Sequence, residues 1–107
     1  MVKEKYLAEI ENCREKIIEL YMANKLTQCI PNEIYDEELK ELLIIMCDNA
    51  IEYGLCIREY QIRKKQFGRY IWYIKKNDLN EHDIFKIIGD IYKMVDKDDY
   101  YFRAHQE

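Results

Sequence analysis

The sequence has few residues that make tight turns. Its 107 residues include three glycines and one proline. A sheet-rich domain needs turn signals about every 8–12 residues, and this chain does not supply them. The length fits one domain with one core. The composition therefore predicts a single all-α domain.

The sequence also lacks the residues and motifs of common catalytic sites. Serine is absent, and histidine occurs only as His82 and His105. There is no glycine-rich phosphate loop and no H-E-x-x-H zinc motif. We therefore expect a protein that is not an enzyme, with no catalytic residues and no cofactor.

Cysteine is present, but its spacing fits neither a disulfide framework nor a zinc site. Cys13, Cys29, Cys47 and Cys56 form no C-x-x-C pair. Cys13 and Cys47 fall on apolar helical faces, so we expect both to be buried thiols. No metal site is expected.

Long hydrophobic runs are missing as well. No apolar run reaches the roughly 18 residues that a membrane-spanning helix needs. The first residues, MVKEKYLAEIE, carry charges where a signal peptide needs an apolar segment. Isoleucine, lysine, glutamate, asparagine and tyrosine are common and alanine is rare, as in proteins of AT-rich genomes. We expect a cytoplasmic protein, bacterial or phage-encoded, with no membrane partner.

Apolar residues recur with helical period at both ends of the chain. A first helix is predicted over residues 3–24. Residues 25–32 are then a connection, because Pro31 disfavours helical dihedrals at the residue before it, Ile30. The last helix has Asn80 as N-cap, Asp83 three residues later, and an apolar face to about Val95. Residues 1–95 are then the helical domain, and residues 96–107 an acidic, aromatic tail.

The middle of the chain has the longest apolar repeat. Steps of four and three residues run from Leu39 to Ile74, with Lys64 as the one charged position. The favoured interpretation is one long central helix, about residues 36–76, bent at Gly54, at Gly68 or at both. A break with Gly54 as a left-handed cap, or a strand over Tyr70–Ile74, also remains open. The predicted fold is a bundle of three to four helices.

Two short motifs lie in this repeat. Residues Asp48–Gly54, DNAIEYG, resemble the N-box of histidine-kinase-type ATPase domains, which implies that Asn49 would help to hold magnesium and ATP. That family also needs glycine-rich lid motifs and a mixed sheet, which this sequence does not offer. Ala50 and Gly54 have the Ala-x-x-x-Gly spacing of many helix-turn-helix motifs, with a basic helix to follow. Arg63, however, occupies a position that is normally buried in that motif.

Charge is segregated along the chain. Residues 1–57 carry a net charge of −6, residues 58–76 a net charge of +6, and residues 77–107 a net charge of −4. The basic block also contains several aromatic residues, and Tyr, Trp and Arg dominate interface hot spots. The predicted partner-binding residues are Arg58, Arg63, Lys64, Lys65, Arg69, Trp72, Tyr73 and Lys76.

The sequence thus predicts a small regulatory protein that binds and modulates a macromolecular partner. Inhibitors, antitoxins, immunity proteins and phage anti-defence proteins share this size and lack of catalytic groups. A protein is the favoured partner. The alternative is a helix-turn-helix-like protein that binds nucleic acid through Arg58–Lys76. The long apolar repeat also allows a homodimer.

Overall fold

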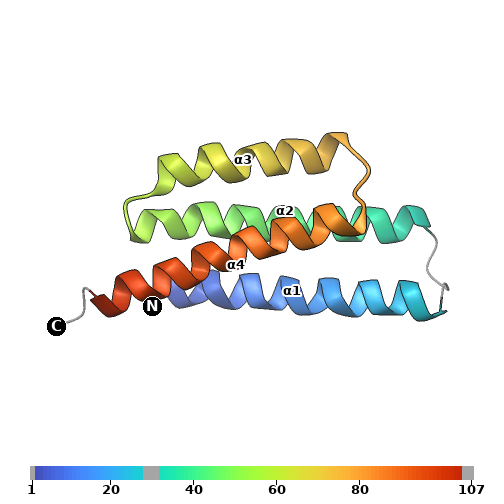
Figure 1. Cartoon of the computed structure of the whole chain (residues 1–107), viewed down its shortest axis with the longest axis horizontal. Coiled ribbons are helices and arrows are strands. Elements are labelled where there is room, and N and C mark those ends of the chain that lie inside the picture. The colour runs from blue at the N-terminus through green and yellow to red at the C-terminus, as the bar shows by residue number, and fades with distance from the viewer. Residues whose placement is uncertain (1, 28–31, 105–107) are drawn as a thin grey trace.

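The computed structural model describes residues 2–27 and 32–104. It contains four helices, α1 (Val2–Thr27), α2 (Asn32–Tyr53), α3 (Tyr60–Lys76) and α4 (Glu81–Ala104), and a short 3-10 turn, Gly54–Cys56 (Figure 1). These residues include no strand, and Tyr70–Ile74 belongs to α3. The predicted all-α bundle is confirmed.

The first three helices lie side by side in one layer. Each runs antiparallel to the one before it, and α4 crosses one face of the layer diagonally (Figure 1). Because α2 is in the middle of the layer, it packs against each of the other helices. The result is an elongated molecule with extents of 51 × 24 × 21 Å.

The core is built by the apolar residues that the sequence repeats predict. Ile10, Cys13 and Ile17 of α1 are buried, and so is the predicted cysteine of α2, Cys47. Cys56 is exposed, and Cys29 lies outside the described residues. α2, α3 and α4 contribute the following to the same cluster: Leu39, Leu43, Met46, Ala50, Ile51, Phe67, Ile74, Ile84, Ile87, Ile88 and Ile91.

The prediction of one continuous central helix is wrong. α2 ends at Tyr53, a 3-10 turn follows, and α3 returns antiparallel to α2 (Figure 1). The apolar repeat continues through this reversal because α2 and α3 both face the same core. The argument for a dimer that covers one long helix therefore no longer applies.

Gly54 lies in the turn between α2 and α3, but it is not the left-handed cap that the sequence allowed. Gly54 does not have a positive φ; Arg58 does, at 60°. Gly54 is needed for space instead, because a Cβ there would lie 3.0 Å from both Cα and N of Tyr60. Gly89, by contrast, has no atom within 4 Å of the place of a Cβ, so it marks no close helix crossing.

The start of α4 is as predicted, but its end is not. The backbone N–H of Asp83 donates to Oδ1 of Asn80 at 2.8 Å, and Asp83 accepts from the N–H of Asn80 at 3.5 Å. This reciprocal pair is a capping box. The helix continues to Ala104 and not to about Val95, so much of the segment expected to form a tail is helical.

Removing this cap has a predictable effect on stability. Asn80→Ala is expected to lower the free energy of unfolding by about 1 kcal/mol, because the N–H of Asp83 loses its acceptor. Asn12→Ala is the control, since Asn12 is exposed inside α1 and alanine favours a helix there. Urea denaturation of both variants measures the difference. Equal stability of wild type and Asn80→Ala would contradict the capping role.

Candidate partner-binding surface

Seven of the eight predicted partner-binding residues are exposed. Arg58 lies in the turn before α3, and Lys64, Lys65, Arg69, Trp72, Tyr73 and Lys76 lie on α3. Arg63 is the exception, because only 1% of it is exposed. The structure therefore brings seven of them to the surface and places Arg63 in the interior.

Six exposed side chains form a continuous strip along α3. Their spacing of three, four, three, one and three residues keeps them on one side of the helix. We call these residues the α3 stripe: Ile62, Lys65, Arg69, Trp72, Tyr73 and Lys76. The two largest exposed fractions among its apolar members are 66% at Ile62 and 63% at Trp72. Sequence reasoning missed Ile62, although its place outside the buried repeat was the available signal.

A groove runs beside the α3 stripe, between α3 and α4. Its volume is about 500 Å³, and Arg69, Trp72 and Tyr73 line its α3 side. Asp83, Lys86 and Ile87 line its α4 side. A side chain from a partner could enter this groove between aromatic walls while basic groups lie at its edge.

Hydrogen bonds hold the aromatic wall of the groove in place. The hydroxyl of Tyr70 donates to the carboxylate of Asp90 on α4. Burial, followed by this bond to a carboxylate, raises the pKa of Tyr70 to about 12. The hydroxyl of Tyr73 donates to Asp83 at 3.4 Å. The wall is therefore tied to α4 before any partner binds, which lowers the entropy lost on binding.

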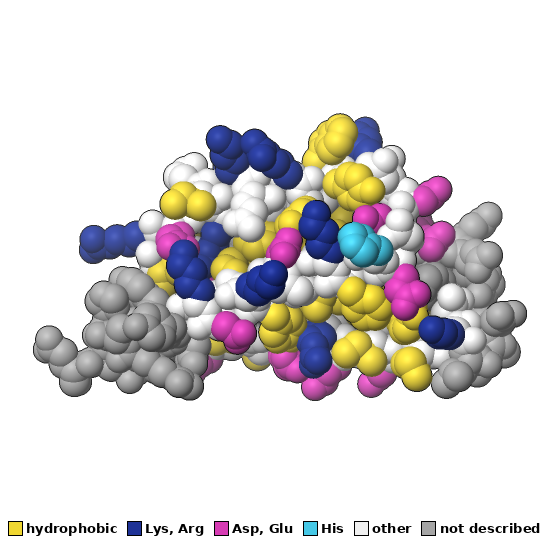
Figure 2. Space-filling model, viewed as in Figure 1, with side chains coloured by type: hydrophobic (Ala, Val, Ile, Leu, Met, Phe, Trp, Pro, Cys, Tyr) yellow, Lys and Arg dark blue, Asp and Glu magenta, His cyan; other side chains and the backbone are white. Residues whose placement is uncertain are grey.

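The charge of this surface is mostly positive and mostly unpaired. Figure 2 shows Lys and Arg side chains gathered over α3, at the top of the molecule, beside hydrophobic ones. Within the described part of the chain, no acidic group forms an ion pair with Lys65, Arg69 or Lys76. These three cations are free to meet charges on another molecule.

Arg63 has a structural role instead of a role at the surface. Its guanidinium donates to the carboxylate of Asp98 on α4, to Glu59 at 3.2 Å, and to the carbonyl oxygen of Ala50 on α2 at 3.4 Å. It also lies 5.6 Å from the centre of the Tyr53 ring. Position 63 is buried, whereas Lys64, the charged position of the predicted repeat, is exposed. The arginine therefore turns inward and brings α2, α3 and α4 together.

The partner of Arg63 is just as deeply buried. Asp98 is 1% exposed, and burial raises its pKa although the neighbouring guanidinium acts in the opposite direction. Nε of Arg63 and Oδ2 of Asp98 have no hydrogen-bond partner among the described groups. The pair is therefore a buried ion pair that is incompletely satisfied, and removing one member of such a pair is costly.

Two residues that the sequence singled out for their chemistry, Cys47 and Asn49, have structural surroundings. Burial raises the pKa of Cys47 to about 12, which leaves the thiol protonated and unreactive. The side-chain amide of Asn49 donates to the carbonyl of Ile45 at 2.8 Å, inside its own helix. Across residues 2–27 and 32–104 there is no strand and no metal-binding cluster of His, Cys, Asp and Glu. The resemblance to the N-box does not extend to the fold.

The helix-turn-helix arrangement is not present either. In that motif two helices cross at about 90–120°. Here α3 runs alongside α2, antiparallel to it (Figure 1). Arg63, which would be buried in such a motif, is buried in this different arrangement.

No family model, curated protein or solved structure matches the chain. In the part that the structure describes, none of the helices is long and apolar enough to cross a membrane. The α3 stripe and the groove beside it are therefore the main basis for a functional argument.

Proposed function

We propose that the protein is a non-enzymatic regulator that binds an acidic surface of a protein partner through the α3 stripe. Its class is that of the small inhibitors, antitoxins, immunity proteins and phage anti-defence proteins, which act by covering a surface of another macromolecule. The exposure of Trp72 carries the proposal. A tryptophan that is 63% exposed is unusual for a protein surface with no binding role.

The neighbours of Trp72 strengthen this argument. Arg69 and Tyr73 are adjacent on the same face and line the same groove. Trp, Tyr and Arg are the three residue types most enriched in binding hot spots, because they bury large areas and make directional polar contacts. The ties of Tyr70 and Tyr73 to α4 support a surface that changes little on binding.

The charge of the surface indicates the chemistry of the partner. Lys65, Arg69 and Lys76 favour an acidic partner, and they would steer it into an encounter at low salt. Nucleic acid offers the same sign of charge. However, the α3 stripe also exposes the apolar side chains of Ile62 and Trp72, which a protein interface buries and a phosphate backbone does not. A protein is therefore the better fit, and nucleic acid becomes an outcome of the test.

Affinity purification from the native host, with and without nuclease, tests the proposal. Trp72→Ala is expected to weaken capture of the partner about 30-fold or more, the effect of losing a hot spot worth about 2 kcal/mol. Phe85→Ala is the matched control, since Phe85 is an aromatic residue of α4 that is 45% exposed and does not belong to the α3 stripe. Phe85→Ala should capture the partner as strongly as wild type does.

Two results would contradict the proposal. If the partner is retained equally by wild type and by Trp72→Ala, the α3 stripe is not the binding surface. If nuclease releases everything that binds and purified protein retains nucleic acid, the nucleic-acid alternative replaces the proposal.

A further inference from the structure

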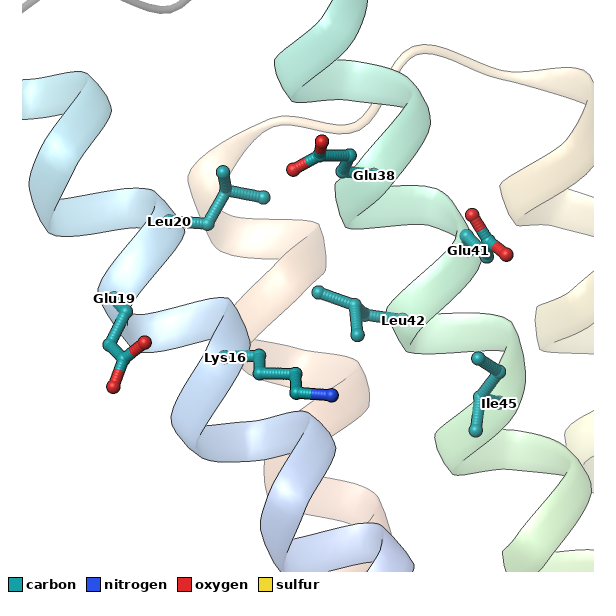
Figure 3. A pocket seen from close by; sticks show the side chains of 7 residues that line it. All are labelled: Lys16, Glu19, Leu20, Glu38, Glu41, Leu42 and Ile45. Atoms are coloured by element: carbon teal, nitrogen blue, oxygen red, sulfur yellow. The ribbon is translucent and has the colours of Figure 1, made fainter.

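The face of the helical layer opposite α4 carries a second groove. It lies between α1 and α2, has a volume of about 590 Å³, and is seen in Figure 3 with α4 behind it. Leu20, Leu42 and Ile45 are half-buried and form an apolar floor. Glu19, Glu38 and Glu41 lie around this floor with one lysine, Lys16. The lining is therefore apolar below and mainly acidic around it.

The acidic side of this groove continues along α2. We call the following residues the α2 ridge: Glu38, Glu41, Leu42, Ile45, Asp48 and Glu52. All six are exposed or half-buried. None of its four carboxylates forms an ion pair with another described residue. The ridge is thus an unpaired acidic strip with an apolar centre.

The α2 ridge and the α3 stripe have the same length and opposite charge. Each spans fourteen residue steps on one side of a helix, which is about 21 Å. The ridge offers four carboxylates and two aliphatic side chains. The stripe offers three cations together with Ile62, Trp72 and Tyr73. Helices commonly bind in such grooves through apolar contacts, with specificity from flanking charges.

We propose that the α3 stripe of one copy docks into the α1–α2 groove, along the α2 ridge, of a second copy. This inference rests on the proposed function in one respect, namely that the α3 stripe is a docking surface. Two copies cannot pair stripe to stripe or ridge to ridge, because like charges would face each other. The contact is therefore heterologous, between two different surfaces.

A heterologous contact leaves one stripe and one ridge free on every dimer. The α3 stripe borders the groove between α3 and α4, on the α4 side of the layer. The α2 ridge borders the groove between α1 and α2, on the opposite side. One copy can therefore use its stripe and its ridge at the same time. Assembly then continues to larger chains or to a closed ring. Each docked stripe is unable to bind the protein partner, so self-association competes with the proposed function.

The test uses two variants that each lose one surface. Glu38→Lys with Glu41→Lys disables the ridge, and Arg69→Ala with Trp72→Ala disables the stripe. Sedimentation equilibrium of wild type should show a mass that rises with concentration at low salt. In about 0.5 M NaCl, where the Debye length is only a few ångströms, the mass should fall toward that of one chain. Far-UV circular dichroism checks that both variants remain helical.

Mixing the variants gives the decisive result. Each variant alone should be a monomer, and an equimolar mixture should form a 1:1 dimer and nothing larger, since only one stripe and one ridge remain active. A wild type that is a monomer at every concentration would overturn the inference. So would a variant that dimerises alone, or a mixture that stays monomeric.

The same variants separate this inference from the proposed function. Glu38→Lys with Glu41→Lys keeps the α3 stripe, so it should still capture the protein partner from the host. If wild type is a monomer but this variant captures a partner that Trp72→Ala loses, only the self-association is wrong. If the mixture dimerises but no variant captures a partner, only the proposed function is wrong.

Discussion

Replacing Asp98 with leucine is expected to lower the free energy of unfolding by about 3–5 kcal/mol. The change leaves the guanidinium of Arg63, which is 1% exposed, without its buried carboxylate. Glu59 and the carbonyl of Ala50 remain as acceptors, but Glu59 is partly open to solvent and serves Lys97 as well. Urea denaturation followed by circular dichroism measures the loss.

Two further variants distinguish a buried charge from simple packing. Asp98→Asn keeps an oxygen acceptor for Arg63 and should lose much less stability. Arg63→Met together with Asp98→Leu removes both charges and should recover most of the loss, because an apolar pair avoids the desolvation penalty. That penalty is visible in the raised pKa of Asp98. A double variant as unstable as Asp98→Leu alone would contradict this explanation.

Replacing Gly54 with alanine is expected to destabilise the protein by about 1–3 kcal/mol, the usual cost of overpacking. The new Cβ would lie 3.0 Å from N and Cα of Tyr60 and from Cδ of Arg63. Two of these atoms belong to the backbone that begins α3, so the turn itself has to move. Thermal and urea unfolding of the purified variant measure the effect.

The other two glycines provide controls of opposite sign. Gly68 lies inside α3 and Gly89 inside α4, and neither has an atom within 4 Å of the place of a Cβ. Alanine at either position should raise the stability by up to about 1 kcal/mol, because alanine favours a helix over glycine. If Gly54→Ala behaves like Gly68→Ala, the close approach at the turn is not important for stability.

Most of the helical regions and of the core could be predicted from the sequence, but not the separation of α2 from α3 or the end of α4. Leu39, Leu43, Met46 and Ala50 repeat with helical period, and each is buried. Asn80 and Asp83 predicted the start of α4, because a capping box depends on residues three positions apart. Where the determining contacts are local, the prediction is confirmed.

The chain reversal could not be predicted because its determinants are not local. Apolar residues recur past Gly54 whether α3 extends α2 or folds back beside it, and only the exchange of Lys64 for Arg63 at the buried face distinguishes the two arrangements. The left-handed residue is Arg58, for which the sequence offers no turn signal. The space required at Gly54 exists only once Tyr60 and Arg63 have packed against it.

The structural role of Arg63 could not be predicted either, because its main contact is with a residue distant in the sequence. Its carboxylate partner, Asp98, is 35 residues away in a segment expected to form a tail, and nothing in the sequence joins the two. The other seven candidate residues, which include Arg69 and Trp72, are exposed, but exposure alone does not identify a partner. Their function stays a prediction, which the experiments on Trp72 address.

The pair of Arg63 and Asp98 also has a consequence for the register of α4. A slide of α4 by one turn would put Ile84 in the place of Ile88 and Ile87 in the place of Ile91. Two of the four buried isoleucine places would keep an isoleucine, but Asn80 and Asp83 would enter the buried places of Ile84 and Ile87. The same slide would put Met94 in the place of Asp98 and leave Arg63 facing a thioether. The buried charge pair near the end of α4 and the polar residues at its start therefore oppose the same slide, so α4 is held in one alignment from both ends.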